Sequence, residues 1–437
     1  MRAVWQTLAQ RRDLRLVLGA GLVSLTGDWV LRVGLAYHIY VLTGSTLASA
    51  TMLLASFLPQ VLLGSLAGVF VDRWDRKHTM IVANLLLAAG LAPLLLVHSV
   101  DRVWVVYVVL LWEGCVQQFF APAEEALLPS LVPDDRLVTA NALVGQTRDV
   151  SRLIGSAVGG VAVATGGMPL LTCVDAGSFV LSAVMISLVR TPGRVSAVTA
   201  AAVVRAESVR HRLGALRREW ADGLRLSTHH QVLRVIMIFL LVTCVGEGIM
   251  STLFAPFVRS TLAGSGQEYG LIVSVQAVGG IVGGLLAASV GEWVRPSALL
   301  GWGAAAFGAI DLVMFLYPLA YVAIWPAVVC MVVVVGVPGA LLIAGAMTLL
   351  QRHTADSHRG RVFGSLGAVE GAAILVGTLS AGVLGEVVGI VPVLVAQGAG
   401  YMLAGLGVLV ALRAGGESPV VPTADPSSLH ARAGKLD

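Results

Sequence analysis

Twelve apolar segments divide the chain, six on either side of one long arginine-rich stretch. Each has about 20 residues or more, enough for an α-helix to cross a hydrocarbon core about 30 Å thick. Backbone groups find no water to bond inside a bilayer, so such segments must be helical. Spans are expected at 14–41, 46–71, 78–98, 102–122, 142–164, 169–189, 232–257, 268–290, 297–317, 321–349, 360–386 and 390–412.

This pattern predicts an all-α membrane protein with twelve transmembrane helices in two pseudo-symmetric six-helix bundles, 1–189 and 232–412. Residues 190–231 are expected to be a cytoplasmic linker containing an amphipathic helix on the inner leaflet, because apolar residues recur there at helical spacing. Those residues are Val209, Leu213, Leu216, Trp220 and Leu224. The tail, 413–437, is rich in Pro, Ser and Ala and is expected to be disordered.

Composition supports a membrane protein, since 57% of the residues are hydrophobic and only 12% are charged. A soluble chain with so few charges could not cover its surface. With the N-terminus in the cytoplasm, the inside segments and the cytoplasmic ends of the adjoining spans hold 24 of the 29 Arg and Lys residues. The positive-inside rule therefore predicts a plasma-membrane protein with both termini cytoplasmic, and nucleic acid is not an expected partner.

No enzyme motif is visible in the sequence. A phosphate-binding P-loop needs Gly-Lys followed by Ser or Thr, but Lys77 follows Arg76 and Lys435 precedes Leu436. The four Cys residues all fall inside expected spans, and their spacing suggests neither a disulfide framework nor a metal site. We therefore expect no catalysis, cofactor or metal. The number and symmetry of the spans indicate a secondary transporter, and without a P-loop its transport must be driven by gradients.

The loop between spans 2 and 3 resembles the signature of the major facilitator superfamily, Gly-x-x-x-Asp-Arg-x-Gly-Arg-Arg/Lys. The chain matches it at Gly68, Asp72, Arg73, Arg76 and Lys77, and it carries Asp75 where the signature has Gly. The resemblance implies two bundles around a cavity that opens alternately to each side, with this cluster latching the halves at the cytoplasmic end. The alternative interpretation is a basic loop that only sets topology.

Span 5 contains Arg152, Gly155, Gly159 and Gly160, which resemble the antiporter motif of drug–proton exchangers, although Ser156 stands in place of its proline. Generic packing of small residues is the alternative interpretation. Thr26-Gly27-Asp28-Trp29 and Ala121-Pro122-Ala123 are similar to the branch of drug exporters that includes macrolide efflux proteins and siderophore exporters.

Charged groups at bilayer depth are costly, so they are expected to face a cavity, to pair or to be protonated. Four acids lie near the middle of their spans: Asp28, Glu113, Glu247 and Glu370. Of these, Glu370 is on a span that the resemblance places outside the cavity lining. Asp175 and Asp311 are expected to be structural.

Helical spacing gives three of these acids neighbours on the same face. Arg32 lies one turn from Asp28, Gln117 one turn from Glu113, and Thr243 and Ser251 flank Glu247. A pair such as Asp28 and Arg32 can act as a protonation switch, or it can neutralise itself and keep the helix in register. Both interpretations stay open at this point.

We therefore expect a secondary active transporter that exports amphipathic small molecules, such as drugs or secreted metabolites, by proton antiport. Its expected partners are the substrate, protons and membrane lipids, and it needs no second subunit to form a pathway. The alternatives are a dedicated exporter of a siderophore or other metabolite, and an uncoupled facilitator of lipid or solute.

Overall fold

The computed structural model describes residues 11–71, 74–133, 136–191, 225, 230–290, 294–354 and 359–413. These ranges contain helices and no β-strand, which confirms the predicted all-helical fold. Most of the predicted linker helix, the tail from 414, and Asp72 and Arg73 of the loop motif lie outside the described residues.

The first group of helices is α2 (Arg12–Thr43), α3 (Thr46–Val71), α4 (Arg76–Gly90), α5 (Val103–Leu131), α6 (Leu137–Thr165) and α7 (Gly167–Ser187). The second is α10 (Gln231–Pro256), α11 (Gly266–Val290), α12 (Pro296–Leu316), α13 (Trp325–Val334), α14 (Ala340–Arg352), α15 (Arg359–Val387) and α16 (Ile390–Arg413). The 3-10 segment η1 (Ala92–Leu96) follows α4, η4 (Phe257–Thr261) follows α10, and η6 (Val335–Gly339) joins α13 to α14.

Within the described ranges, ten helical stretches are long and apolar enough to cross a membrane. Helices α3 and α6 stand where the second and fifth spans were predicted, so the structure has a helix for each of the twelve expected spans. Some boundaries were wrong: α5 continues through Pro122 to Leu131, and α6 begins at Leu137 rather than 142. The added part of α5 packs in a buried apolar cluster that includes Leu127, Leu128 and Leu131, so tertiary packing rather than the length of one apolar run sets where this helix ends.

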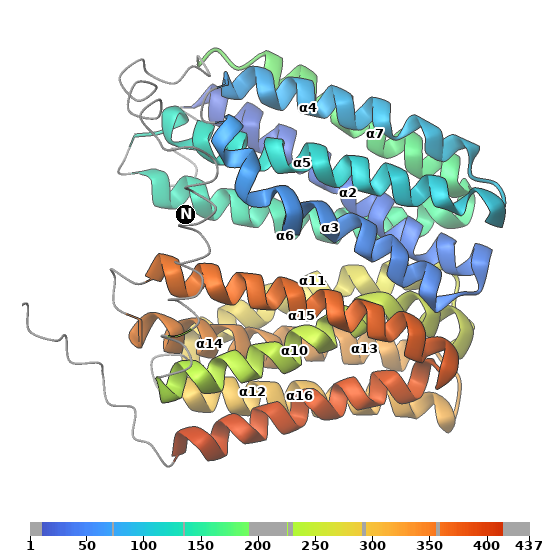
Figure 1. Ribbon diagram of the computed structural model, residues 1–437, viewed down its shortest axis with the longest axis vertical. Helices are drawn as coiled ribbons and strands as arrows, with labels where there is room; N and C mark the ends of the chain where they lie inside the picture. The colour runs from blue at the N-terminus through green and yellow to red at the C-terminus, as the bar shows by residue number, and fades with distance from the viewer. Residues whose placement is uncertain are drawn as a thin grey trace, which may run out of the picture.

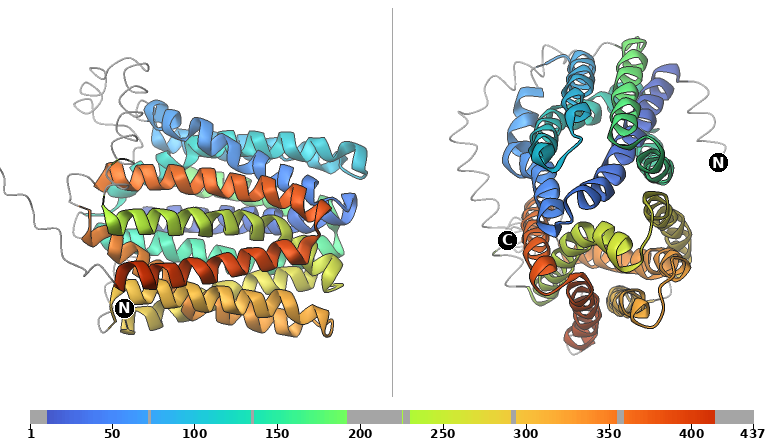
Figure 2. Two further views of the ribbon diagram at one scale, coloured as in Figure 1. Left: turned by 60° about the horizontal axis from the view of Figure 1, so that its bottom comes forward. Right: turned by 90° about the vertical axis from the view of Figure 1, so that its right-hand side faces the viewer.

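The helices run roughly parallel in two groups, α2–α7 and α10–α16, which lie side by side (Figure 1). A view along the helix axes shows the same two groups, one above the other (Figure 2, right). Contacts between the groups are made chiefly by α6 with α11 and by α3 with α15. We call the end where α2 begins and α16 ends the terminal face, and the other end the loop face.

At the loop face the two groups are joined. The Thr46 hydroxyl donates to the Gly382 carbonyl over 2.8 Å, and the Tyr37 hydroxyl donates to the Gly264 carbonyl over 2.8 Å. Glu386 accepts hydrogen bonds from the Ser45 hydroxyl and from the Leu47 backbone N–H. Apolar side chains of α2 share one buried cluster here with α10, η4 and α11. The structure is therefore closed at the loop face.

Candidate functional site

A polar cavity of about 180 Å³ lies among α2, α3 and α5. Seven polar side chains line it: Asp28, Arg32, Ser56, Gln60, Glu113, Gln117 and Gln118. The structure thus brings four of the predicted residues to one place from two helices: Asp28, Arg32, Glu113 and Gln117. A charged cavity of this kind inside an apolar bundle is a candidate site for ions or polar ligand groups.

Proline and glycine shape this cavity. Pro59 lies inside α3, and its ring packs where a Cβ on Gly114 of α5 would stand, only 2.8 Å from the proline Cγ. Only glycine leaves this space, so α3 approaches α5 closely. Ser56 and Gln60, on either side of Pro59, then line the same cavity as Glu113.

Two acids of the cavity keep an unsatisfied oxygen. Gln117 Nε2 donates to Glu113 Oε1 over 3.1 Å, but the buried Glu113 Oε2 accepts no hydrogen bond, and neither does the buried Asp28 Oδ1. Asp28 and Arg32, both in the described part of the chain, form no ion pair. The two side chains are thus not in ion-pair contact, although the charge of Arg32 still acts on Asp28. A buried oxygen without a donor favours either a proton or a cationic ligand group.

A third acid, Asp175 of α7, belongs to this cluster. It is fully buried, its Oδ1 accepts from Ser178, and its charge interacts with those of Asp28 and Glu113. It approaches α2 at Gly27, where a Cβ would stand 2.5 Å from Asp175 Oδ1. We expected Asp175 to be structural, but the structure also places it close enough to Asp28 and Glu113 for their charges to interact. Three acids from three helices therefore share one electrostatic environment. Asp311, by contrast, accepts from Gln397 over 2.9 Å, as a structural acid would.

A second set of charged groups links the two groups of helices. Arg152 of α6 donates a hydrogen bond to the side-chain oxygen of Gln276 on α11. The charge of Arg152 also interacts with Glu247 of α10, which accepts from Ser251 over 3.4 Å. The indole of Trp29 contacts both Arg152 and Arg32, whose guanidinium carbons are 5.2 and 5.3 Å from its ring centre. Cation–π contacts thus connect the cavity to this link.

Glu370 is placed apart from both sets. It is half-buried on α15, near Cys244 of α10, and it does not line the polar cavity. Its predicted role in coupling has less geometric support than the roles of Asp28 and Glu113.

The described part of the loop motif holds one group of helices together. Arg76 Nη1 donates to the Ala126 carbonyl of α5 over 2.7 Å. Lys77 Nζ donates to the carbonyls of Ser187 and Val189, over 2.9 and 2.7 Å, at the C-terminal end of α7. A cation at this position also complements the helix dipole. Gly68 lies in α3, and nothing is described of its surroundings.

The glycines of the antiporter-like motif lie at helix crossings. A Cβ on Gly155 would be 2.5 Å from the Thr26 carbonyl of α2, and one on Gly159 would be 2.7 Å from the Val30 carbonyl. Gly160 faces the other group of helices, where a Cβ would be 2.7 Å from Gly270 Cα of α11. This geometry fits the packing interpretation for all three, and at Gly160 the packing joins the two halves.

Sequence reasoning missed Gln60, Gln118 and Gln276. The sequence did contain a signal for them, because each is an amide side chain within a largely apolar helix, where polar groups form hydrogen bonds to other helices. The hydrogen-bond partner of each amide, however, could not be identified from the sequence. The described residues contain no group of three or more His, Cys, Asp or Glu side chains arranged to hold a metal ion.

Replacing Gln276 by Ala is expected to lower the apparent melting temperature of the purified protein, because hydrogen bonds to charged groups contribute about 1.5–3 kcal/mol. The double variant Gln276→Ala with Arg152→Ala should lose less than the sum of the two single losses, since both changes remove the same contact, although Arg152→Ala also removes the contact with Trp29. Gln231, whose side chain bonds the Ala411 carbonyl at the protein surface, provides the control: Gln231→Ala and Arg152→Ala should act additively. Additive effects of Gln276→Ala and Arg152→Ala would contradict the contact.

A family model described as "Transmembrane secretion effector" matches residues 4–430, which is nearly the whole chain. The chain belongs to this family. The membership confirms the resemblance to major facilitator superfamily transporters, and it confirms that the protein is a transporter rather than an enzyme.

Relatives of this transporter include two efflux proteins. Macrolide efflux protein A of Streptococcus pyogenes is 29% identical over 172 residues, which span 39% of this chain and 42% of that protein. The multidrug efflux pump Tap of Mycolicibacterium fortuitum is 27% identical over 397 residues, 88% of this chain and 92% of that one.

Solved structures share the fold. A bacterial homologue of the iron transporter ferroportin, in an inward-facing state, superposes with a TM-score of 0.72 at 14% identity, covering 92% of this chain and 98% of that one. A bacterial homologue of the lysosomal transporter Spinster, inward-facing and occupied, gives 0.67 at 14% identity, covering 92% and 96%.

Proposed function

We propose that this transporter exports amphipathic small molecules from the cytoplasm in exchange for protons, with the acids of the polar cavity as the coupling groups. The observation that carries the proposal is the pair of buried carboxylate oxygens, on Asp28 and Glu113, that accept no hydrogen bond. A carboxylic acid at such a site is stable when protonated or when a cation faces it. Proton and cationic substrate would therefore exclude each other there.

The contact between Arg152 of α6 and Gln276 of α11 supports a way for a change of charge in the cavity to affect how the two groups of helices are held together. Protonation or substrate binding at Asp28 changes the field at Arg32, and Arg32 and Arg152 both contact the ring of Trp29. Arg152 in turn contacts Gln276 across the interface. A change of charge in the cavity would thus bias the contact that holds the halves together, which is what alternating access requires.

Orientation completes the proposal. The distribution of Arg and Lys along the chain favours a plasma-membrane protein with both termini in the cytoplasm. The loop face would then be extracellular, and the closed contacts there would make this the inward-facing state. Export as the direction is supported by the two efflux relatives, macrolide efflux protein A and Tap.

The test uses energised inverted membrane vesicles that contain the protein, with a pH-sensitive dye. Macrolides, tetracyclines, lipophilic dyes and a siderophore are added one at a time. A substrate is expected to release protons from the acidified lumen in vesicles with the transporter and not in vesicles without it. If no compound releases protons while a labelled compound still crosses the membrane, proton coupling is wrong and the uncoupled facilitator replaces it.

A further inference from the structure

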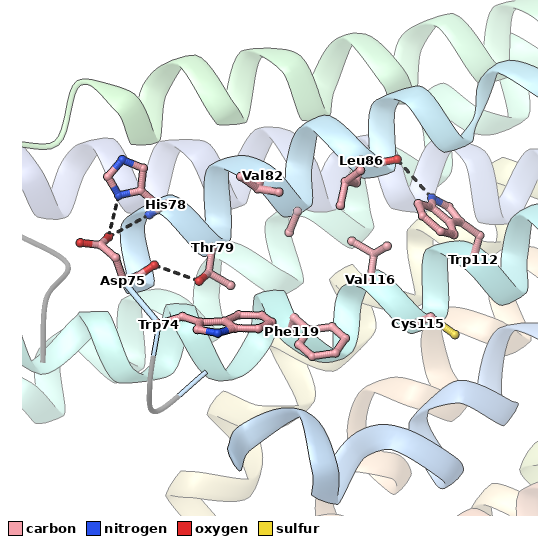
Figure 3. A pocket seen from close by; sticks show the side chains of 11 residues that line it. Trp74, Asp75, His78, Thr79, Val82, Leu86, Trp112, Cys115, Val116 and Phe119 are labelled. Atoms are coloured by element: carbon pink, nitrogen blue, oxygen red, sulfur yellow. Dashed lines mark hydrogen bonds and ion pairs between the residues drawn. The ribbon is translucent and has the colours of Figure 1, made fainter. Parts of the chain in front are cut away.

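A second and larger hollow, of about 750 Å³, lies between α4 and α5 on the outside of the bundle (Figure 3). We call it the α4–α5 groove. Its lining includes Trp74, Val82, Leu86, Trp112, Cys115 and Phe119. Four of these side chains are 41–52% exposed, so the groove opens sideways, toward the bilayer, and not into the polar cavity.

The groove has the shape and chemistry of a ligand site rather than of a plain lipid-facing surface. It has the volume of a pocket for a drug-sized ligand, with apolar walls and few polar groups. Trp74 and Phe119 stack at one end, 5.8 Å between ring centres, and Trp112 closes the other (Figure 3). Rigid aromatic faces favour a bulky or planar apolar body.

Asp75, His78 and Thr79 line one end of the groove, and apart from Cys115 the rest of its lining is apolar or aromatic. Asp75 caps α4: its Oδ1 accepts from the His78 backbone N–H over 3.0 Å and lies 3.2 Å from His78 Nδ1. Burial raises the pKa of Asp75, but these hydrogen bonds outweigh it and hold the pKa below the ordinary value. Arg76 and Lys77 direct their charged ends to carbonyls of α5 and of the end of α7. An ionised carboxylate therefore stands at the mouth of the groove.

Helix α5 alone separates this groove from the charged cavity. Trp112 and Phe119 line the groove. Glu113, which follows Trp112, and Gln117, two positions before Phe119, line the cavity on the other side of the helix. A molecule held in the groove would lie on the other side of the helix that carries a coupling acid. This juxtaposition gives the groove a position suited to collecting substrate from the membrane.

We propose that the α4–α5 groove is a docking site for lipophilic organic cations that arrive from the bilayer, with the apolar body between the helices and the positive charge at Asp75. The inference deepens the proposed function, because it rests on the amphipathic cationic substrate proposed above and assigns it an entry site from the bilayer. An anionic phospholipid is the competing occupant, and the carboxylate of Asp75 disfavours its phosphate.

Cys115, which is half-buried in the groove wall, provides the readout. The full-length protein with Cys173→Ser, Cys244→Ala and Cys330→Ala is placed in nanodiscs, and the rate of maleimide alkylation at Cys115 is measured. Tetraphenylphosphonium, a lipophilic cation, is expected to slow alkylation saturably. Tetraphenylborate, an anion of the same shape, should not.

Three variants sharpen the test. Asp75→Asn, which keeps a good helix cap, should raise the half-maximal concentration of tetraphenylphosphonium about fivefold. Val82→Trp fills the groove and should abolish the protection, whereas Leu85→Trp, equally large and exposed on α4 outside the groove, should leave it unchanged. Melting temperatures of the Trp variants verify that both are folded.

The results separate the two proposals. Equal protection by both ions, protection that survives Val82→Trp, or protection by anionic phospholipid with none by the cation would each overturn the docking site. Asp28→Asn should leave the protection of Cys115 intact. Proton release that fails while this protection persists counts against coupling and not against the groove.

Discussion

Replacing Asp28 by Asn is expected to abolish substrate-driven proton release, and to weaken the binding of a cationic substrate in the cavity, while the protein still folds. Asparagine has the shape of the protonated acid but cannot give up a proton, so the transporter would stay in one charge state. Coupling free energies are about 1–3 kcal/mol, which predicts a loss of accumulation-driven export by about 5- to 150-fold. The measurement is dye-reported proton release in inverted vesicles, beside binding of a labelled substrate.

Glu113→Gln should have an effect of the same kind, because Glu113 lines the same cavity and has an unsatisfied oxygen. Glu125→Gln provides the matched control, since it makes the same chemical change at an exposed position of the same helix. If vesicles that contain Asp28→Asn or Glu113→Gln still release protons on addition of substrate, as vesicles with the unmodified protein do, the cavity is not the coupling site.

Replacing Gly160 by Val is expected to prevent closure of the loop face. The added Cβ would stand 2.7 Å from the Gly266 carbonyl oxygen and from Gly270 Cα, so α6 and α11 would have to move apart. Overpacking costs about 1–3 kcal/mol, which would reduce the population of the closed state by about 5- to 150-fold. Export should fall with it, because a transporter that cannot close one face cannot alternate.

Closure is measured by disulfide formation between Ser45→Cys and Glu386→Cys, two positions that are hydrogen-bonded in the closed state. The yield should fall in Gly160→Val. Gly145→Val, on the same helix at a position with no atom within 4 Å of an added Cβ, should leave the yield and the export unchanged. An unchanged yield in Gly160→Val would show that the α6–α11 contact does not set closure.

The cavity shows what helical spacing can predict. Asp28 with Arg32, and Glu113 with Gln117, are pairs four residues apart, and each pair lies on one face of its helix and lines the cavity. The sequence could not state that the two faces meet, nor that Asp28 and Arg32 would form no ion pair. Those outcomes depend on where α2 and α5 stand relative to each other.

The groove and the interface show what spacing could not predict. Trp112 and Glu113 are neighbours in sequence, yet one lines the groove and the other the cavity. A turn of about 100° per residue separates them, so a small error in helix rotation would exchange their roles. Nothing in the sequence indicated that Gln276 contacts Arg152, because the two residues are 124 positions apart in the chain and on different helices.

The sequence by itself determined the twelve helices and their two groups, because hydrocarbon requires long apolar segments and hydrogen-bonded backbone groups whatever the neighbouring helices are. The motif between spans 2 and 3 indicated the family. The sequence also identified the acids within the spans, whose charge at bilayer depth is energetically costly. Only the tertiary structure decided which of them gather: Asp175 joined Asp28 and Glu113, while Glu370 stood apart. The reason is physical, since in a membrane both the lipid-facing and the packed sides of a helix are apolar, and periodicity cannot tell them apart.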